Sequence, residues 1–214
     1  MLVLDVYFDY SCPWSYLAFV RAREAAMRTG AEIRWRPVLA DRIFEAVNPK
    51  RLANRLAVEP RIASYQQKNL SDWARFCSIS ITLPEGWPVD STHALAGAVA
   101  AIEQDLIVQY SNAVFSAYFA DGRDISQIAV LAEIATSAGL DARAFKAKLE
   151  ESKPVEQVLS NSDELIKRGG FGIPTMFVGD DMYFGNHSMP LVELALGQAS
   201  GETFIMPGEH SSLG

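Results

Sequence analysis

The chain has 214 residues, 49% of them hydrophobic, which suffices for one domain with a full apolar core. Its net charge of −7 and its lack of a basic tract argue against a nucleic-acid partner. The N-terminus has no signal-peptide pattern, and the longest apolar stretch, residues 94–102, is too short and too rich in alanine to span a membrane. We therefore expect a cytoplasmic protein without membrane contact, in which isolated thiols stay reduced.

Residues 2–8 form a short apolar segment rich in β-branched and aromatic side chains, which predicts a buried strand. Residues 16–28 then show the apolar spacing that is typical of a helix, and Gly30 supplies its stop. Cys12 lies in the turn between these two elements. It is followed by Pro13, which suits a first helical turn because its missing N–H costs nothing there. This pattern places Cys12 at the N-cap of the helix.

A cysteine at a helix N-cap faces unpaired backbone N–H groups and the positive end of the helix dipole. We therefore expect the pKa of the Cys12 thiol to lie below that of a free cysteine, which would make Cys12 a nucleophile. The alternative is a buried, unreactive cysteine, a common environment for this residue type. The position of Cys12 at a strand-to-helix turn favours the reactive site.

Cys77 is the second of the two cysteines, so the chain has no disulfide framework. Ser15 occupies the motif position at which a second thiol would be needed for a dithiol redox cycle. Cys77 follows Trp73 and Phe76 on a segment with the pattern of an amphipathic helix. This indicates a core or half-buried residue, with a resolving thiol as the less favoured alternative.

A second strand is predicted over residues 31–38, after which strand character disappears until residue 175. Helical patterns fill the interval, over residues 61–77, 91–104, 107–119, 126–137, 142–152 and 155–167. A hairpin pattern follows at residues 175–178 and 182–184, then a short helix at 190–196 and a tail from Gly197 that is expected to be loosely ordered.

This order of elements predicts an α/β fold, in which a thioredoxin-like sheet is interrupted by a large all-helical insertion. We expect a single domain over residues 1–214. Its thioredoxin-like part comprises residues 1–40 and 168–200, the helical insertion residues 41–167, and the tail residues 201–214.

A glycine-rich segment with Pro174 at its end precedes the predicted hairpin. A proline that enters a strand after glycines serves a turn or a cis peptide bond. In thioredoxin-like proteins a proline at this point is cis and lies opposite the helix-capping nucleophile, and the backbone of the preceding residue, here Ile173, can pair with an extended thiol substrate. A trans proline in an ordinary loop is the alternative, which the presence of the Cys12 motif disfavours.

Three runs of the sequence together carry a family resemblance: residues 8–18, residues 118–125, and residues 171–175 followed by 184–186. They resemble the 2-hydroxychromene-2-carboxylate isomerases, which belong with kappa-class glutathione transferases in the DsbA-like branch of the thioredoxin fold. The resemblance covers residues 2–200. It implies a DsbA-like fold and, because members of the family are commonly homodimers, a homodimer.

The resemblance also implies that glutathione is the cofactor and that the residue directly before the motif proline, here Cys12, is catalytic. In the isomerases a serine at that position activates the glutathione thiolate by hydrogen bonding; the sulfur adds to the conjugated substrate, permits rotation about a former double bond, and leaves. A cysteine donates a weaker hydrogen bond and can itself form a mixed disulfide with glutathione. The hydroxyls of Ser11 and Ser15 are candidates to share the role, with helix capping as the alternative.

Further cofactor-binding candidates follow from the same resemblance. After the hairpin the family commonly carries Ser-Asp or Asn-Asp, whereas this chain has Asn186 and His187. Asn186 can hydrogen-bond a carboxylate, and a protonated His187 would prefer a carboxylate to an ammonium, with a solvated histidine as the alternative. Asn54 corresponds to an asparagine in the family's thiol-substrate cleft. Three aromatic residues are candidates for a wall against an aromatic substrate, with helical core as the favoured alternative: Tyr65, Trp73 and Trp87.

We therefore expect a glutathione-dependent isomerase that acts on a conjugated aromatic carboxylate in aromatic-compound degradation, with Cys12 as its catalytic residue and Ile173 and Pro174 in its cofactor site. The alternative is a monothiol thiol-disulfide oxidoreductase, or a glutathione transferase of the DsbA or kappa type, that uses Cys12. A scaffold that binds peptides without turnover is the third hypothesis. The two cysteines and three histidines lack ligand spacing, so no metal site is expected.

Overall fold

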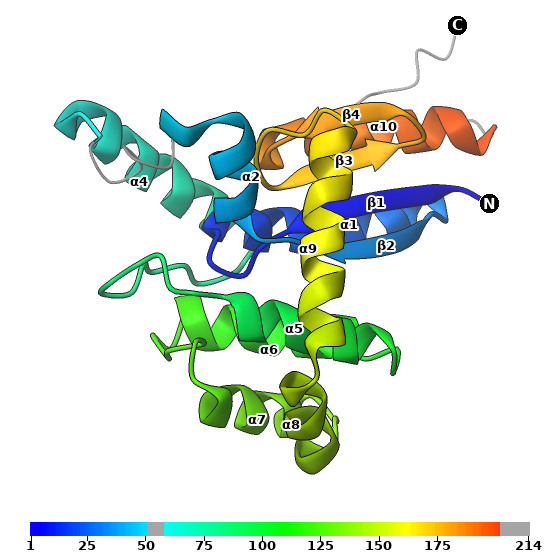
Figure 1. Ribbon diagram of the computed structural model, residues 1–214. Helices are drawn as coiled ribbons and strands as arrows, with labels where there is room; N and C mark the ends of the chain where they lie inside the picture. Colours follow the sequence, from blue (N-terminus) through cyan, green and yellow to red (C-terminus); the bar gives the residue numbers. More distant parts are fainter. Residues whose placement is uncertain (51–57, 202–214) are drawn as a thin grey trace, which may run out of the picture.

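The computed structural model describes residues 1–50 and 58–201, and it contains a four-stranded mixed sheet, drawn in the upper half of Figure 1. The strands, in sheet order, are β2 (Glu32–Pro37), β1 (Val3–Phe8), β3 (Thr175–Val178) and β4 (Asp181–Phe184). β2 runs parallel to β1, whereas β3 runs antiparallel to both β1 and β4. The parallel pair needs a crossover connection, which α1 (Pro13–Thr29) supplies.

Helices α1 and α10 (Met189–Ser200) contact each other and cover one face of the sheet. Side chains alternate along β1, so Leu4 and Val6 point into this layer while Tyr7 joins a cluster on the opposite face. Small side chains of α1, including Ala18 and Ala22, pack against Leu4 and Val6. The helix that begins at Cys12 is therefore held directly on the sheet.

The opposite face is covered by α2 (Ala40–Val47) and α9 (Ser152–Lys167). Ile43 of α2 and Leu165 of α9 pack with Tyr7 in one buried cluster. Figure 1 shows α9 crossing beside the sheet and continuing along the helical block, and it contacts α2, β2 and α5. This helix therefore connects the two parts of the molecule.

Four helices form a block beside the sheet: α5 (Thr92–Ile102), α6 (Ile107–Phe119), α7 (Ile128–Ser137) and α8 (Ala142–Glu150). α5 is central to the block and contacts the other three. Gly97 permits this packing, because a Cβ at that position would overlap the Tyr110 side chain. Phe8 and Tyr10 reach from the end of β1 into the block and pack on Phe115. The sheet and the block therefore share an aromatic core.

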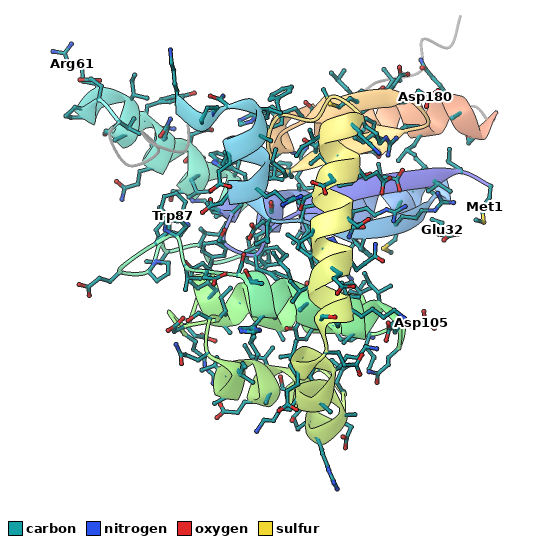
Figure 2. The ribbon with its side chains drawn as sticks, in the orientation of Figure 1. Met1, Glu32, Arg61, Trp87, Asp105 and Asp180 are labelled. Atoms are coloured by element: carbon teal, nitrogen blue, oxygen red, sulfur yellow. The ribbon has the colours of Figure 1, made fainter. Side chains whose placement is uncertain are left out.

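α4 (Pro60–Phe76) packs on α1 through its second half, where Leu70 and Ala74 are buried. Its first half is exposed and projects from the body of the molecule, with Arg61 near its tip (Figure 2). Among the described helices, none is long and apolar enough to cross a membrane.

The predicted α/β fold with a thioredoxin-like sheet and an all-helical insertion is confirmed, and the predicted strands match the observed ones closely. α2 was not predicted, because with only Ala40 and Ile43 buried it is too short to show a periodic apolar pattern. The expected loose order from Gly197 is wrong for residues 197–200, since α10 runs to Ser200 and ends at Gly201 with a positive φ of 73°. Residues 202–214 lie outside the described part of the chain. The predicted boundaries between the thioredoxin-like part and the helical insertion stay a prediction.

A partly buried polar network surrounds the Tyr7 hydroxyl on the face of the sheet beside α9. The Tyr7 hydroxyl donates to Glu164 Oε1 at 2.9 Å and accepts from Arg168 Nη1 at 3.2 Å. Arg168 also donates to Asp5 Oδ2 at 3.1 Å, and its guanidinium lies 3.6 Å from the centre of the Phe177 ring. Burial raises the pKa of Tyr7 to about 12; Arg168 opposes the rise and Glu164 adds to it. The network ties the end of α9 to β1 and β3.

Tyr7 should make the protein sensitive to alkaline pH. The pKa of a tyrosine in the unfolded chain is about 10, whereas the pKa of Tyr7 in the folded protein is about 12. Protonated Tyr7 therefore stabilises the fold fully below pH 10, and this contribution is lost as the pH rises from 10 to 12. We predict that Tyr7→Phe makes the decline of the unfolding free energy shallower in that window. Urea unfolding at a series of pH values measures the slope.

The control is Tyr65→Phe. Because Tyr65 is 65% exposed, this substitution should leave the slope equal to that of the wild type. A Tyr7→Phe slope equal to that of the wild type between pH 10 and 12 would contradict the assignment.

Candidate active site

Cys12 is the N-cap residue of α1, as predicted, with an extended backbone at φ −100° and ψ 115°. Pro13 occupies the first helical turn, and the helix ends at Gly30, whose φ of 68° lets its N–H reach the Ala26 carbonyl. The Cys12 side chain is partly buried. The local sequence therefore places this thiol at the start of the helix, as expected.

The loop that enters β3 meets the Cys12 loop. The peptide bond between Ile173 and Pro174 is cis, which confirms the prediction. Ile173 belongs to the buried apolar cluster against which Cys12 packs, and the Gly185 N–H donates to the Pro174 carbonyl at 2.8 Å. Segments from near the two ends of the chain therefore come together around the thiol.

A buried carboxylate, that of Asp9, organises the loop between β1 and α1. Its Oδ1 accepts the N–H and hydroxyl of Ser11 at 2.8 and 2.9 Å and the hydroxyl of Ser91 at 2.6 Å, and its Oδ2 accepts the N–H of Ala40 at 2.9 Å. Burial raises the pKa of the Asp9 carboxyl, and these hydrogen bonds oppose the rise. Asp9 was not among the residues selected from the sequence, where the available signal is an acidic side chain at the end of a buried strand.

Ser11 and Ser15, two of the predicted cofactor-binding residues, form hydrogen bonds within this loop. Ser11 donates to Asp9, and Ser15 is fully buried with its hydroxyl accepting the Asp9 N–H at 3.4 Å. These contacts agree with a structural role for both serines, and their contact with a cofactor stays a prediction. Asn54, a further predicted cofactor-binding residue, lies outside the described residues.

Trp87 fixes the loop from the side of the helical block. Its indole N–H donates to the Ser11 carbonyl at 2.7 Å. Trp87 lies in the segment between α4 and α5 (Figure 2), where it is partly buried against the aromatic core. It therefore belongs to a loop and not to a helix, and its role as a wall for an aromatic substrate stays a prediction.

The expectation that the helix N-terminus lowers the pKa of the Cys12 thiol is wrong. Burial raises that pKa, and the nearby charge of Asp9 adds to the rise. The hydroxyl and N–H of Ser15 and the N–H of Trp14 favour the thiolate, but they do not compensate for its lost hydration. Cys12 is therefore predominantly a neutral thiol.

Cys77 is half-buried at the end of α4, in line with the prediction. Its charged neighbours are Arg21 and Glu24 of α1. Arg21 follows Cys12 by nine positions, roughly 13 Å along a helix. A disulfide needs Cα atoms within about 7 Å of each other, so this location disfavours Cys77 as a resolving thiol.

Asn186 and His187 lie in the 3₁₀ turn η1 (Asn186–Ser188) beside α1. Asn186 is fully buried, and Arg21 donates to its backbone carbonyl at 2.7 Å and to its Oδ1 at 3.0 Å. His187 is exposed; its Nε2 accepts the indole N–H of Trp73 at 3.1 Å, and its ring centre lies 5.5 Å from that of Trp14. The fold thus brings His187 beside Trp14 in the first turn of α1 and Asn186 beside Arg21 in the middle of that helix, while their binding of a cofactor stays a prediction.

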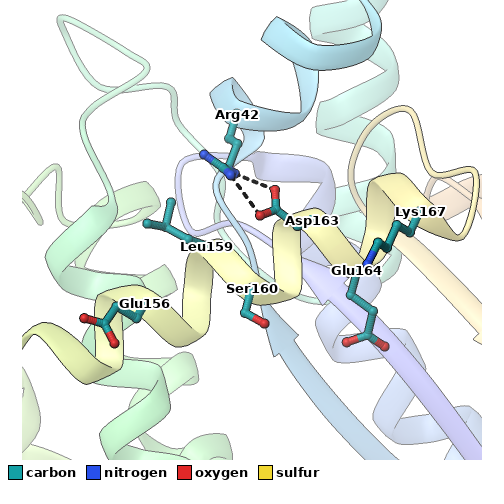
Figure 3. A pocket seen from close by; sticks show the side chains of 7 residues that line it. All are labelled: Arg42, Glu156, Leu159, Ser160, Asp163, Glu164 and Lys167. Atoms are coloured by element: carbon teal, nitrogen blue, oxygen red, sulfur yellow. Dashed lines mark hydrogen bonds and ion pairs between the residues drawn. The ribbon is translucent and has the colours of Figure 1, made fainter.

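A surface groove of about 680 Å³ lies between α2 and α9 (Figure 3). Arg42 and Asp163 face each other across it through two hydrogen bonds of 2.7 and 2.8 Å. None of its lining residues belongs to the Cys12 loop or to the Ile173 segment: Arg42, Glu156, Leu159, Ser160, Asp163, Glu164 and Lys167. The groove is therefore separate from the candidate active site. In the described part of the chain, no group of His, Cys, Asp and Glu side chains could hold a metal ion.

Comparison with known proteins supports the likeness that the motifs indicate. The model of the DSBA-like thioredoxin domain matches residues 3–197. The chain is 29% identical over 198 residues to 2-hydroxychromene-2-carboxylate isomerase from Pseudomonas putida, covering 92% of this chain and 95% of that protein. A solved 2-hydroxychromene-2-carboxylate isomerase has a TM-score of 0.78 at 28% identity, covering 92% of this chain and 95% of that one. A probable DsbA oxidoreductase from Streptomyces coelicolor has a TM-score of 0.79 at 20% identity, covering 99% and 95%, and shows the fold alone.

We predict that Trp87→Phe lowers the free energy of unfolding by about 1 kcal/mol, because the Ser11 carbonyl loses its indole donor. Trp73→Phe is the matched control. It also removes an indole N–H, but the partner is the exposed ring of His187, which water can solvate, so the loss should be smaller. Urea unfolding of the three proteins gives the comparison. Equal losses in the two variants would show that the hydrogen bond from Trp87 to Ser11 contributes no more to the free energy of unfolding than the exposed one from Trp73 to His187.

Proposed function

This chain belongs to the family of DSBA-like thioredoxin domains, and we propose that it is a glutathione-dependent isomerase of the 2-hydroxychromene-2-carboxylate type. Its substrate would be a conjugated aromatic carboxylate from aromatic-compound degradation. One observation carries the proposal: a cysteine at the N-cap of α1 that packs in one cluster with the residue before a cis-proline, in a chain that aligns with an isomerase over 92% of its length.

The residues around Cys12 fit a thiol cofactor. The N–H groups of Trp14 and Ser15 favour negative charge on a sulfur at the start of α1, and the positive end of the helix dipole acts in the same direction. The partly exposed Cys12 side chain is available to a ligand, and the Ile173–Pro174 segment lies beside it. When bound, glutathione would supply the thiolate that adds reversibly to the conjugated double bond.

Cys12 would act here as a hydrogen-bond donor. Its neutral S–H can donate to a cofactor thiolate, as a serine hydroxyl would, although more weakly. The backbone of Ile173 would orient the extended cofactor, in the manner of an added strand. The chain itself neither gains nor loses electrons in this role, which is consistent with an isomerisation.

The second candidate function is that of a monothiol oxidoreductase or a glutathione transferase, and Cys12 itself favours it. A thiol can exchange with a disulfide through its thiolate, which a serine cannot do. The raised pKa of Cys12 weighs against fast exchange, because little thiolate is present at neutral pH.

We predict that Cys12→Ser keeps or raises isomerase activity, because a hydroxyl is the better hydrogen-bond donor, and that it abolishes any thiol exchange. Cys12→Ala should lose at least ~10-fold in kcat, since one hydrogen bond to a charged group contributes about 1.5–3 kcal/mol. Isomerisation of 2-hydroxychromene-2-carboxylate with and without glutathione, followed by absorbance, measures both effects.

Intact mass after incubation with oxidised glutathione tests the second function. Cys77→Ser is the control, because it keeps Cys12 while removing the other thiol. Absence of isomerisation by the wild type, together with a reversible glutathione adduct on Cys12 in the Cys77→Ser variant, would reject the isomerase and support the oxidoreductase.

A further inference from the structure

The Asp9 carboxylate lies where three helices begin. It accepts the Ser11 N–H in the loop before α1, the Ala40 N–H in the first turn of α2, and the hydroxyl of Ser91, the N-cap residue of α5. Helix N-termini carry partial positive charge, so all three helices favour an anion at this point. Asp9 is 2% exposed, and both of its carboxylate oxygens accept hydrogen bonds, as those of an ionised carboxylate do, so it is the buried negative charge nearest in sequence to the motif thiol.

The Cys12 thiol shares this environment. The Cys12 N–H donates to the Asp9 carbonyl at 3.1 Å, and the N–H of Asp9 donates to the Ser15 hydroxyl at 3.4 Å. These bonds hold the backbone of Asp9 beside Cys12 and Ser15, and the Asp9 carboxylate itself binds Ser11, the residue directly before Cys12. A thiolate at Cys12 would place a second negative charge close to the Asp9 carboxylate. Because this site is largely shielded from water, the repulsion between the two charges would be only weakly screened.

We propose that Asp9 is a positioning residue whose buried negative charge adds to the burial of the sulfur in keeping Cys12 in its protonated form, so that Cys12 serves as a hydrogen-bond donor and not as a nucleophile. Asp9 acts through Cys12 and through the loop, and it does not touch the reacting atoms. The inference deepens the proposed isomerase, on which its catalytic consequence rests. It also explains how a cysteine can stand where the related isomerases are expected to use a serine.

Two tyrosines that interact with Asp9 do not supply a compensating positive charge. Tyr10 and Tyr118 both interact with it electrostatically, and burial raises the pKa of each, so they stay neutral at physiological pH. On α5, His93 follows Ser91 by two positions; on α2, Arg42 pairs with Asp163 through two hydrogen bonds. The positive ends of the three helices remain as the opposing field.

The test is the pH dependence of Cys12 alkylation by iodoacetamide, followed by intact mass in a Cys77→Ser background. Only the thiolate reacts, so the pH midpoint of the rate reports ionisation of Cys12, while the plateau at high pH reports its accessibility. Asp9→Asn should lower the midpoint by about one unit and raise the rate at pH 7 about tenfold. A purely structural role for Asp9 would change the plateau and leave the midpoint in place.

Ser91→Ala provides a milder perturbation that keeps the carboxylate but removes one of its donors, so the anion is less stabilised. The midpoint should fall in the same direction as in Asp9→Asn, by a smaller amount. Ser111→Ala is the matched control, because Ser111 is also a buried serine of the helical block but bonds to the Tyr10 hydroxyl at 2.7 Å. Its midpoint should equal that of the parent protein.

An unchanged or raised midpoint in Asp9→Asn overturns the proposal, and if that variant does not fold, an unchanged or raised midpoint in Ser91→Ala does so. A shift in Ser111→Ala equal to that in Ser91→Ala also overturns it, since the effect would then come from loosened packing. None of these rates requires isomerase turnover. Failure of the proposed function would appear as missing isomerisation by the wild type, with the alkylation result unaffected.

Discussion

The buried Asp9 carboxylate is the interaction on which the arrangement of the site depends. A buried carboxyl group destabilises a fold unless it is hydrogen-bonded, and Asp9 meets that requirement with donors from the α1 loop, α2 and α5. Neither α2 nor α5 has a capping hydrogen bond from its own N-cap side chain. The Asp9 carboxylate instead accepts the first N–H of α2, from Ala40, and the hydroxyl of Ser91, the N-cap residue of α5. The starting points of these helices are thereby fixed relative to Cys12.

Two effects compete at the Cys12 sulfur, and their relative size decides its chemistry. The first turn of α1 favours a thiolate, whereas burial against the Ile173 cluster and the neighbouring carboxylate favour the thiol. A helix N-terminus stabilises a partly exposed anion by about 0.3–1 kcal/mol, while removing a charge from water costs several times as much. The thiol form therefore prevails, which suits a donor to a bound thiolate better than it suits disulfide exchange.

Much of the fold follows from local sequence, and the failures have physical causes. Pro13 and Gly30 mark the ends of α1 because their backbone constraints act within the helix itself. The hairpin of β3 and β4 is likewise marked by the turn at Gly179. α2 was missed because its start depends on Asp9, 31 positions away, and on burial of Ile43 against α9. α10 continues past Gly197 because that residue is buried in the helix, which a glycine in isolation does not indicate.

For the site, the sequence alone was enough to locate Cys12 at a helix start, because that depends on a short motif whose geometry is local. The cis bond at Pro174 and its place beside Cys12 followed from the likeness to thioredoxin-like proteins, since the two segments lie far apart in the chain. The ionisation of Cys12, the hydrogen bonds of Asp9, the contact of Trp87 with Ser11 and the burial of Asn186 under Arg21 were decided by tertiary structure. Solvation and electrostatic interaction depend on which distant segments surround a group, and those neighbours are known only once the chain has folded.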